Sequence, residues 1–291
     1  MTYSIVAADP EQRIFGVAVA SKAMCVGAHV PWGAAAAGAL ATQAWHDLRY
    51  GYEGLDLLRR GRSAAATVHE LSHGDPDAPH RQLGLIDSAG RIASYTGSRC
   101  LPWAGGMCGE HFAVQGNLLA GAQVVEAMAG AWEEQVDYPL IPRLAHALLA
   151  GDEAGGDRRG RQSAAVRVWR QDPSPRTDAM DTIADVRVDD AEFPVHDLVR
   201  MIPRIWLEYG SADEAGARPL EGELRERVAS RLGVAPAAAE EALESWANEE
   251  NLESRLLPGR IDPTVLDVLE SGSAAVIERA RATPPGRFWP V

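Results

Sequence analysis

The segment MTYSIVAADPEQRIFGVAVASKAM, residues 1–24, decides the fold predicted for this chain. Residues 3–8 and 14–20 are rich in β-branched and small apolar side chains, and the intervening DPEQR supplies Asp-Pro turn chemistry. We therefore expect an N-terminal β-hairpin. In an antiparallel pair the end of the second strand returns beside the start of the first, so Lys22 should lie near Thr2.

Strand and helix patterns alternate along the next part of the chain. Further strands are predicted over residues 32–45, 81–87, 91–97, 111–116, 163–169 and 183–189. Helices are predicted over residues 51–61, 63–73, 121–135, 139–150 and 194–208. Ser63 has the position of an N-cap. Roughly seven or eight strands, mostly in hairpins, with helices in two separate groups, predict a layered α+β domain.

The C-terminal third has a different pattern and predicts a second, smaller domain. Residues 210–219, GSADEAGARP, are small and polar, so we expect a linker between a domain at 1–209 and one at 220–291. The last segment is rich in helical spacing, and Asp262 before Pro263 is typical of an N-cap followed by proline at the first helical position. We expect this domain to be helical.

Composition excludes several classes of partner. The 291 residues carry a net charge of −13, which repels phosphate backbones, so no nucleic-acid partner is expected. The start of the chain has no secretory pattern. No apolar run approaches the ~20 residues that span a bilayer. We therefore expect a cytoplasmic protein with no membrane partner.

The cysteines and histidines show no metal-ligand spacing. Cys25, Cys100 and Cys108 form neither a disulfide framework nor a CxxC signature, so reduced thiols are expected. The histidines contain no HExxH pattern. We expect no metal and no other cofactor.

Thr2 is the first candidate for chemistry. Removal of Met1 would leave the Thr2 hydroxyl beside its own α-amine, whose pKa in peptides is around 8. A terminal threonine can then act as a nucleophile with its amine as the base. The alternative is an ordinary Met-Thr start with no such role.

Lys22 is the second candidate, because it is the single lysine among 28 Lys and Arg residues. A lysine amine can shift its pKa and handle protons, whereas arginine stays charged. An ammonium near Thr2 would favour the ionised hydroxyl and lower the pKa of the terminal amine. The alternative is a surface lysine at a strand end.

Amide side chains supply candidate donors. Asn117 follows a strand and a glycine and precedes a helix, so its amide could face a cavity and hold an oxyanion together with backbone N–H groups. The alternative is a structural Asn in a turn. Gln43 and Gln115 are further candidate donors, equally open to a structural interpretation.

A glycine- and arginine-rich loop, AGGDRRGRQSAAV at residues 154–166, is the last candidate. It lacks the P-loop pattern. A carboxylate on a substrate could pair with Arg158 or Arg159, since the guanidinium fork matches a carboxylate. The alternative is a solvated turn with ordinary ion pairs.

Several blocks of the sequence resemble one known family. In chain order they are MTYSIVAADP, GVAVASK, VGAHVPWG, GALATQAW, YGYEGLDLL, RQLGLIDSAGRIASYTGSRCLPWAGG, FAVQGNLLAG and GDRRGRQSAAV. They cover about residues 1–200 and are similar to an uncharacterised bacterial and archaeal family, domain of unknown function 1028. The resemblance implies an N-terminal-nucleophile (Ntn) hydrolase-like fold, which is a four-layer αββα sandwich of two stacked antiparallel sheets between helix layers.

The resemblance also singles out residues. The candidates that fall on family motif positions are Thr2, Lys22, Gln43, Gln115, Asn117, Asp157, Arg158 and Gln162. His46 and Asp47 stand where relatives usually carry other residues. Residues 224–271 are similar to a peptidoglycan-binding domain that is often appended to this family.

These observations give two main functional hypotheses. The first is an amidohydrolase that cleaves the C–N bond of a small-molecule or peptide amide. In it Thr2 attacks, Lys22 tunes the nucleophile, Asn117 holds the oxyanion, and the loop with Asp157, Arg158 and Gln162, together with Gln43 and Gln115, binds the substrate. The second is a non-catalytic protein that binds a glycan or peptide, such as a cell-wall fragment. A metal-dependent hydrolase is a third alternative. Separately, we expect the protein to form a homodimer, with which its acidic surface and stacked sheets are compatible.

Overall fold

The computed structural model describes residues 2–173, 181–210 and 212–282. These residues form two compact units, Met1–Val199 and Arg200–Val291. The division falls inside helix α6 (Pro194–Tyr209), whereas the predicted domain boundary lies after residue 209.

The predicted N-terminal hairpin is confirmed and lies at the centre of a six-stranded antiparallel sheet. The strands of this larger sheet are β1 (Thr2–Asp9), β2 (Ile14–Ser21), β7 (Gly105–Gly109), β8 (Phe112–Asn117), β9 (Ser163–Arg170) and β10 (Thr182–Val188). Their order is β10-β9-β2-β1-β8-β7. Because β1 lies between β2 and β8, both neighbours present side chains to the first residue of the hairpin.

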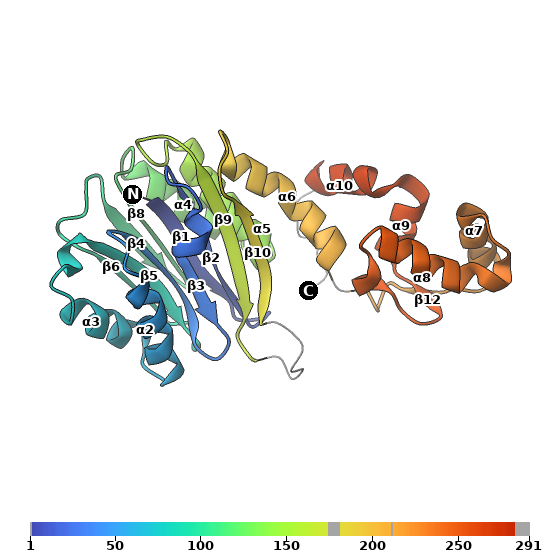
Figure 1. Ribbon diagram of the computed structural model, residues 1–291, viewed down its shortest axis with the longest axis horizontal. Coiled ribbons are helices and arrows are strands. Elements are labelled where there is room, and N and C mark those ends of the chain that lie inside the picture. The colour runs from blue at the N-terminus through green and yellow to red at the C-terminus, as the bar shows by residue number, and fades with distance from the viewer. Residues whose placement is uncertain (1, 174–180, 211, 283–291) are drawn as a thin grey trace. The chain divides into compact units, whose positions relative to one another are not determined.

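A second, four-stranded antiparallel sheet faces the first (Figure 1). Its strands, in spatial order, are β3 (Pro31–Ala34), β4 (Gly38–Ala44), β5 (Arg81–Asp87) and β6 (Ile92–Thr96). The sequence prediction of one strand over residues 32–45 is wrong, since the chain turns back between β3 and β4. Ala36 and Gly38 have φ values of 56° and 140°, so the turn uses backbone conformations that interrupt a strand.

Helices cover the outer faces of the two sheets. The helices α2 (Leu48–Arg59) and α3 (Ala64–His73) pack on the smaller sheet, and α4 (Gln123–Glu134) and α5 (Leu140–Glu153) pack on the larger sheet. The short α1 (Val26–His29) lies against β9. Ser63 caps α3 as predicted, because its hydroxyl accepts a hydrogen bond from the Ala66 N–H.

The C-terminal unit is built mainly from helices, as predicted. Its elements after α6 are α7 (Gly222–Leu232), α8 (Ala239–Glu249), α9 (Pro263–Ser271) and α10 (Ser273–Ala282), with the short paired strands β11 (Arg218–Pro219) and β12 (Arg260–Ile261). Asp262 caps α9 through its bonds to the Thr264 and Val265 N–H groups. The end of the predicted linker is therefore part of this unit, since β11 lies within residues 210–219.

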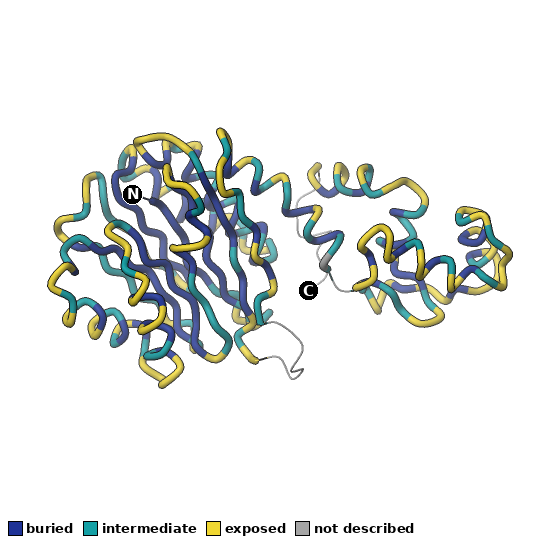
Figure 2. The backbone as a smooth tube through the Cα atoms, viewed as in Figure 1, coloured by how far each residue is buried: buried dark blue, intermediate teal, exposed yellow. Residues whose placement is uncertain are grey.

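The strands that face each other in the N-terminal unit are largely buried (Figure 2). The side chains between them change from polar to apolar along the strands. Side chains alternate across a strand, so the residues that face the other sheet recur at every second position. Far from the start of β1 these residues are apolar, among them Val6, Val17 and Ile86. Near the start of β1 they are polar, and Ser4, Gln82 and Gln115 are all fully buried there.

Gly84 makes room for this polar end. It lies on β5 in the smaller sheet, and a Cβ at this position would overlap the side-chain amide of Gln115 on the facing β8. The absence of a side chain at Gly84 therefore allows the Gln115 amide to enter the layer.

We predict that Gly84→Ala lowers the free energy of unfolding by roughly 1–3 kcal/mol, since overpacking a buried site forces side chains or strands apart. Urea denaturation of the full chain measures this. Gly130→Ala is the matched control, because Gly130 lies in α4 with nothing within 4 Å of the added methyl group. The control should stabilise the protein by about 0.4–1 kcal/mol. Equal effects of the two substitutions would contradict the packing argument.

Candidate active site

Thr2 lies at the start of the central strand β1 and is almost completely buried, with 5% of its surface exposed. Its Oγ1 donates a hydrogen bond to Ser21 Oγ at 3.2 Å. On the other side it pairs with Asn117, the last residue of β8. The carbonyl oxygen of Thr2 accepts a bond from Gln43 Nε2 at 3.3 Å. Its hydroxyl and main chain are therefore held from both neighbouring strands and from the facing sheet.

Thr2 lines a hollow of about 210 Å³. The polar residues around this Thr2 hollow are Thr2, Ser21, Gln43, His29, His46 and Arg159, and the apolar ones are Ala23, Met24, Val26, Val30 and Ala44. The rings of His29 and His46 are 5.7 Å apart. Burial and the neighbouring His29 lower the pKa of His46, so the neutral imidazole is favoured.

Buried side chains behind Thr2 form an amide cluster of Ser4, Gln43, Gln82, Gln115 and Asn117. Gln82 Oε1 accepts bonds from Gln43 Nε2 and from Asn117 Nδ2, each at 2.8 Å. Ser4 Oγ accepts from Gln115 Nε2 at 2.6 Å and donates to Gln43 Oε1 at 2.8 Å. The bonds link β1 and β8 to β4 and β5, so the cluster joins the two sheets.

The amide cluster brings together the predicted residues Gln43, Gln115 and Asn117 beside Thr2. Of these, Gln43 also lines the Thr2 hollow. Gln82, the central acceptor, was not singled out from the sequence. The alternation of Gln82, Gly84 and Ile86 along β5 places all three toward the larger sheet, and this pattern could have identified it.

Asp157 anchors the arginine-rich loop beside Thr2. Its carboxylate is 1% exposed and accepts bonds from the backbone N–H groups of Lys22 and Arg159, both at 2.9 Å. It also pairs with Arg159 Nη2 at 2.8 Å. Arg159 lines the Thr2 hollow, whereas Arg158 is exposed and is not among the residues around that hollow.

Lys22 follows the last residue of β2 and is not among the residues that line the Thr2 hollow. Its Nζ donates to the carbonyl oxygen of Arg161 at 3.1 Å. Lys22 and Gln162 line a different hollow of about 540 Å³, together with Asp190. A role for Lys22 in tuning Thr2 therefore stays a prediction.

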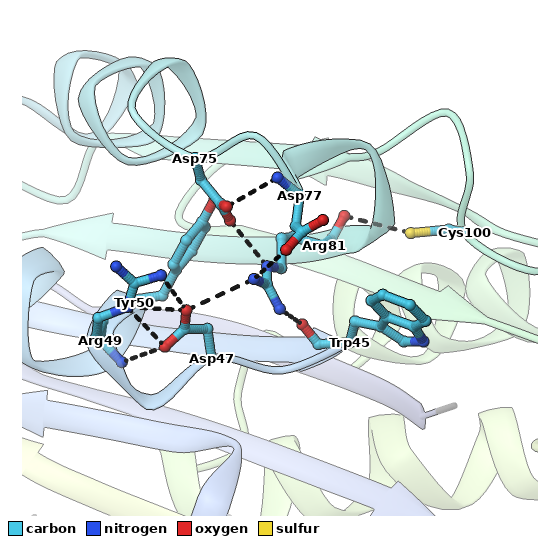
Figure 3. A network of polar contacts seen from close by, with 8 residues as sticks. All are labelled: Trp45, Asp47, Arg49, Tyr50, Asp75, Asp77, Arg81 and Cys100. Atoms are coloured by element: carbon cyan, nitrogen blue, oxygen red, sulfur yellow. Dashed lines mark hydrogen bonds and ion pairs between the residues drawn. The ribbon is translucent and has the colours of Figure 1, made fainter.

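A network of charged groups fixes the turn after β4 (Figure 3). Arg81 is 8% exposed and forms ion pairs with Asp75 at 2.8 Å and Asp47 at 3.5 Å. It also donates to the carbonyl oxygen of Trp45 at 2.5 Å. Because Trp45 lies between Ala44 and His46, this contact holds one wall of the Thr2 hollow. Burial and the bond to Asp75 raise the pKa of Tyr50 well above its usual value.

The part of the chain that the structure describes contains no group of three or more His, Cys, Asp or Glu residues placed to hold a metal ion. In the same residues no helix is long and apolar enough to cross a bilayer. Cys25, Cys100 and Cys108 are free thiols.

Comparison with known proteins supplies a family. A search of curated proteins found no match. Among solved structures, the crystal structure of the protein SPO2555 from Silicibacter pomeroyi, described as a member of DUF1028, is similar with a TM-score of 0.63 and 30% sequence identity. The match covers 74% of this chain and 88% of that one. The model of the family of unknown function DUF1028 matches residues 2–198, so the chain belongs to the DUF1028 family.

Proposed function

We propose that the protein is an amidohydrolase of the N-terminal-nucleophile type, in which Thr2 becomes the first residue once the residues before it are removed. The observation that carries the proposal is the position of the Thr2 hydroxyl. It lines a hollow, is hydrogen-bonded to Ser21, and lies beside amide groups held by the facing sheet. A nucleophile, a base and hydrogen-bond donors in one cavity are the requirements for acyl transfer.

The reaction follows from the groups around Thr2. Thr2 Oγ attacks the amide carbon of the substrate, and the α-amine of the same residue takes the hydroxyl proton. The amine then passes this proton to the leaving nitrogen, the C–N bond breaks, and an ester forms on Thr2. Water attacks the ester and gives a proton to the same amine, which passes it to Thr2 Oγ as the ester C–O bond breaks, so that the acid leaves and the free enzyme is restored.

Asn117 is the proposed donor to the oxyanion. It pairs with Thr2 across β1 and β8, and its amide orientation is set by the bond from Nδ2 to Gln82 Oε1. A side-chain amide has two N–H donors, so one can serve the network while the other serves the substrate. Donors fixed before the reaction stabilise a developing charge without reorganisation.

The architecture supports the same proposal. Two antiparallel sheets face each other, with α2 and α3 on one and α4 and α5 on the other. We therefore assign the N-terminal unit to the four-layer αββα sandwich of Ntn hydrolases. In that arrangement the nucleophile stands at the start of a central strand, which is the position of Thr2.

For the C-terminal unit we propose binding of a peptide or glycan fragment of cell-wall type. The unit contains a hollow of about 250 Å³ whose lining combines apolar Leu243 and Leu257 with charged Glu244 and Arg260. Titration of the full chain with soluble muropeptides tests this role, and absence of saturable binding would contradict it. A homodimer and a cytoplasmic location stay predictions.

We predict that Thr2→Ala lowers turnover of an amide substrate by ~10³-fold or more, because the step that forms the ester is lost. Thr2→Ser keeps a hydroxyl and should retain measurable activity. Release of amine from a library of small amides and peptides measures both variants. Intact mass should show that active protein begins at Thr2. Undiminished turnover by Thr2→Ala, or activity in protein that retains residues before Thr2, would falsify the mechanism.

For Lys22 we predict a positioning role. Lys22→Met should lower kcat/KM by roughly tenfold. This loss is smaller than the ~10²-fold loss of rate that a displacement of a reacting group by about 1 Å can cause. Lys22→Arg should restore activity, since a guanidinium can also donate to the Arg161 carbonyl oxygen. The pH profile of kcat/KM should be the same in the wild-type protein, Lys22→Met and Lys22→Arg. If Lys22→Arg is as inactive as Thr2→Ala, or shifts the profile, then Lys22 handles protons.

A further inference from the structure

The charge of the Thr2 hollow differs from that of the whole protein. The chain has 41 acidic residues against 28 basic ones. Among the described residues that line the hollow there is no Asp or Glu, and Arg159 supplies a guanidinium. Asp157 balances the charge of Arg159, but its carboxylate is 1% exposed and is not among the lining residues. Among the described lining residues a ligand therefore meets N–H donors and no carboxylate, which suits a negatively charged group.

Arg159 is held in a fixed direction. Its Nε and Nη2 donate to the two oxygens of Asp157 at 3.1 and 2.8 Å. Asp157 is itself buried and held by two backbone N–H groups, those of Lys22 and Arg159. The side chain of Arg159 is 33% exposed and lines the hollow, while Asp157 holds the guanidinium in place. Pre-organisation of this kind reduces the ordering cost of binding.

The position of Lys22 strengthens this assignment. Its backbone N–H binds Asp157, and its ammonium binds the carbonyl oxygen of Arg161, so it holds the 157–161 turn from both ends. Arg158 is exposed outside the hollow. Of the two loop arginines considered from the sequence, Arg159 is therefore the one placed beside the nucleophile.

The size of the hollow limits the ligand. A volume of about 210 Å³ lies below the ~300–1,000 Å³ of pockets for drug-sized ligands. At ~30 Å³ per molecule in the liquid it corresponds to roughly seven waters. Ala23, Val26 and Val30 give it an apolar wall. A compact ligand with a short apolar body and one anionic end fits this description.

We infer that Arg159 is the specificity residue of the site and that the substrate is a small amide with a carboxylate close to the scissile bond. This inference rests on the proposed function for the identity of the reacting bond. The guanidinium of Arg159 donates an N–H···O bond to the carboxylate while it stays paired with Asp157, and this contact turns the amide carbon toward Thr2 Oγ.

The test uses the full chain carrying Thr2→Ala, which binds without turnover. Succinamate, a four-carbon amide with one carboxylate, is compared by isothermal titration calorimetry with succinamide, its uncharged analogue. Succinamate should bind at least tenfold more tightly than succinamide. Arg159→Gln should remove this preference, and Arg159→Lys, which keeps the charge but not the fork, should retain part of it. Thermal melting checks that each variant is folded.

Arg158→Gln distinguishes the neighbouring arginines, and the inference requires it to keep the preference for succinamate. Equal binding of the two probes, no saturable binding of either, or loss of preference in Arg158→Gln alone would overturn the inference. Turnover assays separate the two proposals. If the protein prefers succinamate but the processed protein hydrolyses no amide, the proposed amidohydrolase activity is contradicted and the role of Arg159 is not. If charged and uncharged amides are hydrolysed equally, the role of Arg159 is contradicted and the amidohydrolase activity is not.

Discussion

The need to satisfy buried amides between two facing sheets is the constraint on which the N-terminal unit depends. Gln43, Gln82, Gln115 and Asn117 are at most 1% exposed, and a buried polar group without a partner costs about 1–3 kcal/mol. The bonds from Asn117 Nδ2 to Gln82 Oε1 and from Ser4 Oγ to Gln43 Oε1 cross between the sheets and hold β8 and β1 against β5 and β4. An apolar layer would tolerate small shifts between the sheets, but a network of directed hydrogen bonds among Ser4, Gln43, Gln82 and Asn117 does not. The start of β1, and with it Thr2, is thereby held in place.

Two further anchors complete the walls of the Thr2 hollow. Asp157 holds Arg159 on one side, and Arg81 holds the turn that carries His46 on the other. In both cases a buried charge is compensated by an opposite charge and by backbone groups, which is the condition under which buried ions are tolerated. The proposed nucleophile, the proposed oxyanion donor and the proposed anion site are thus held by one connected set of hydrogen bonds and ion pairs.

Much of this arrangement could be predicted from local sequence, because strand alternation and turn chemistry act over short distances. The hairpin from Thr2 to Ser21 and the helix cap at Ser63 follow from such rules, and the amides at Gln43 and Gln115 attract attention as polar residues in apolar strands. The contacts of Lys22 show the limit of this reasoning, since its backbone N–H and its Nζ bind Asp157 and Arg161 in a loop far away in the sequence. The roles of Gln82 and Arg81 depend on partners far away in the sequence, and only the packed sheets reveal them.

The central claim is that Thr2 forms an ester with its substrate, and covalent trapping tests it most directly. A β-lactone acylates an activated hydroxyl by opening its ring, so the whole inhibitor is attached as an ester, and acid quenching before water cleaves this ester preserves the adduct for peptide mapping by mass spectrometry. The account predicts a single stoichiometric adduct on Thr2 in protein whose chain begins at that residue. An adduct confined to Cys25 or Cys108, or none at all in such protein, would contradict it.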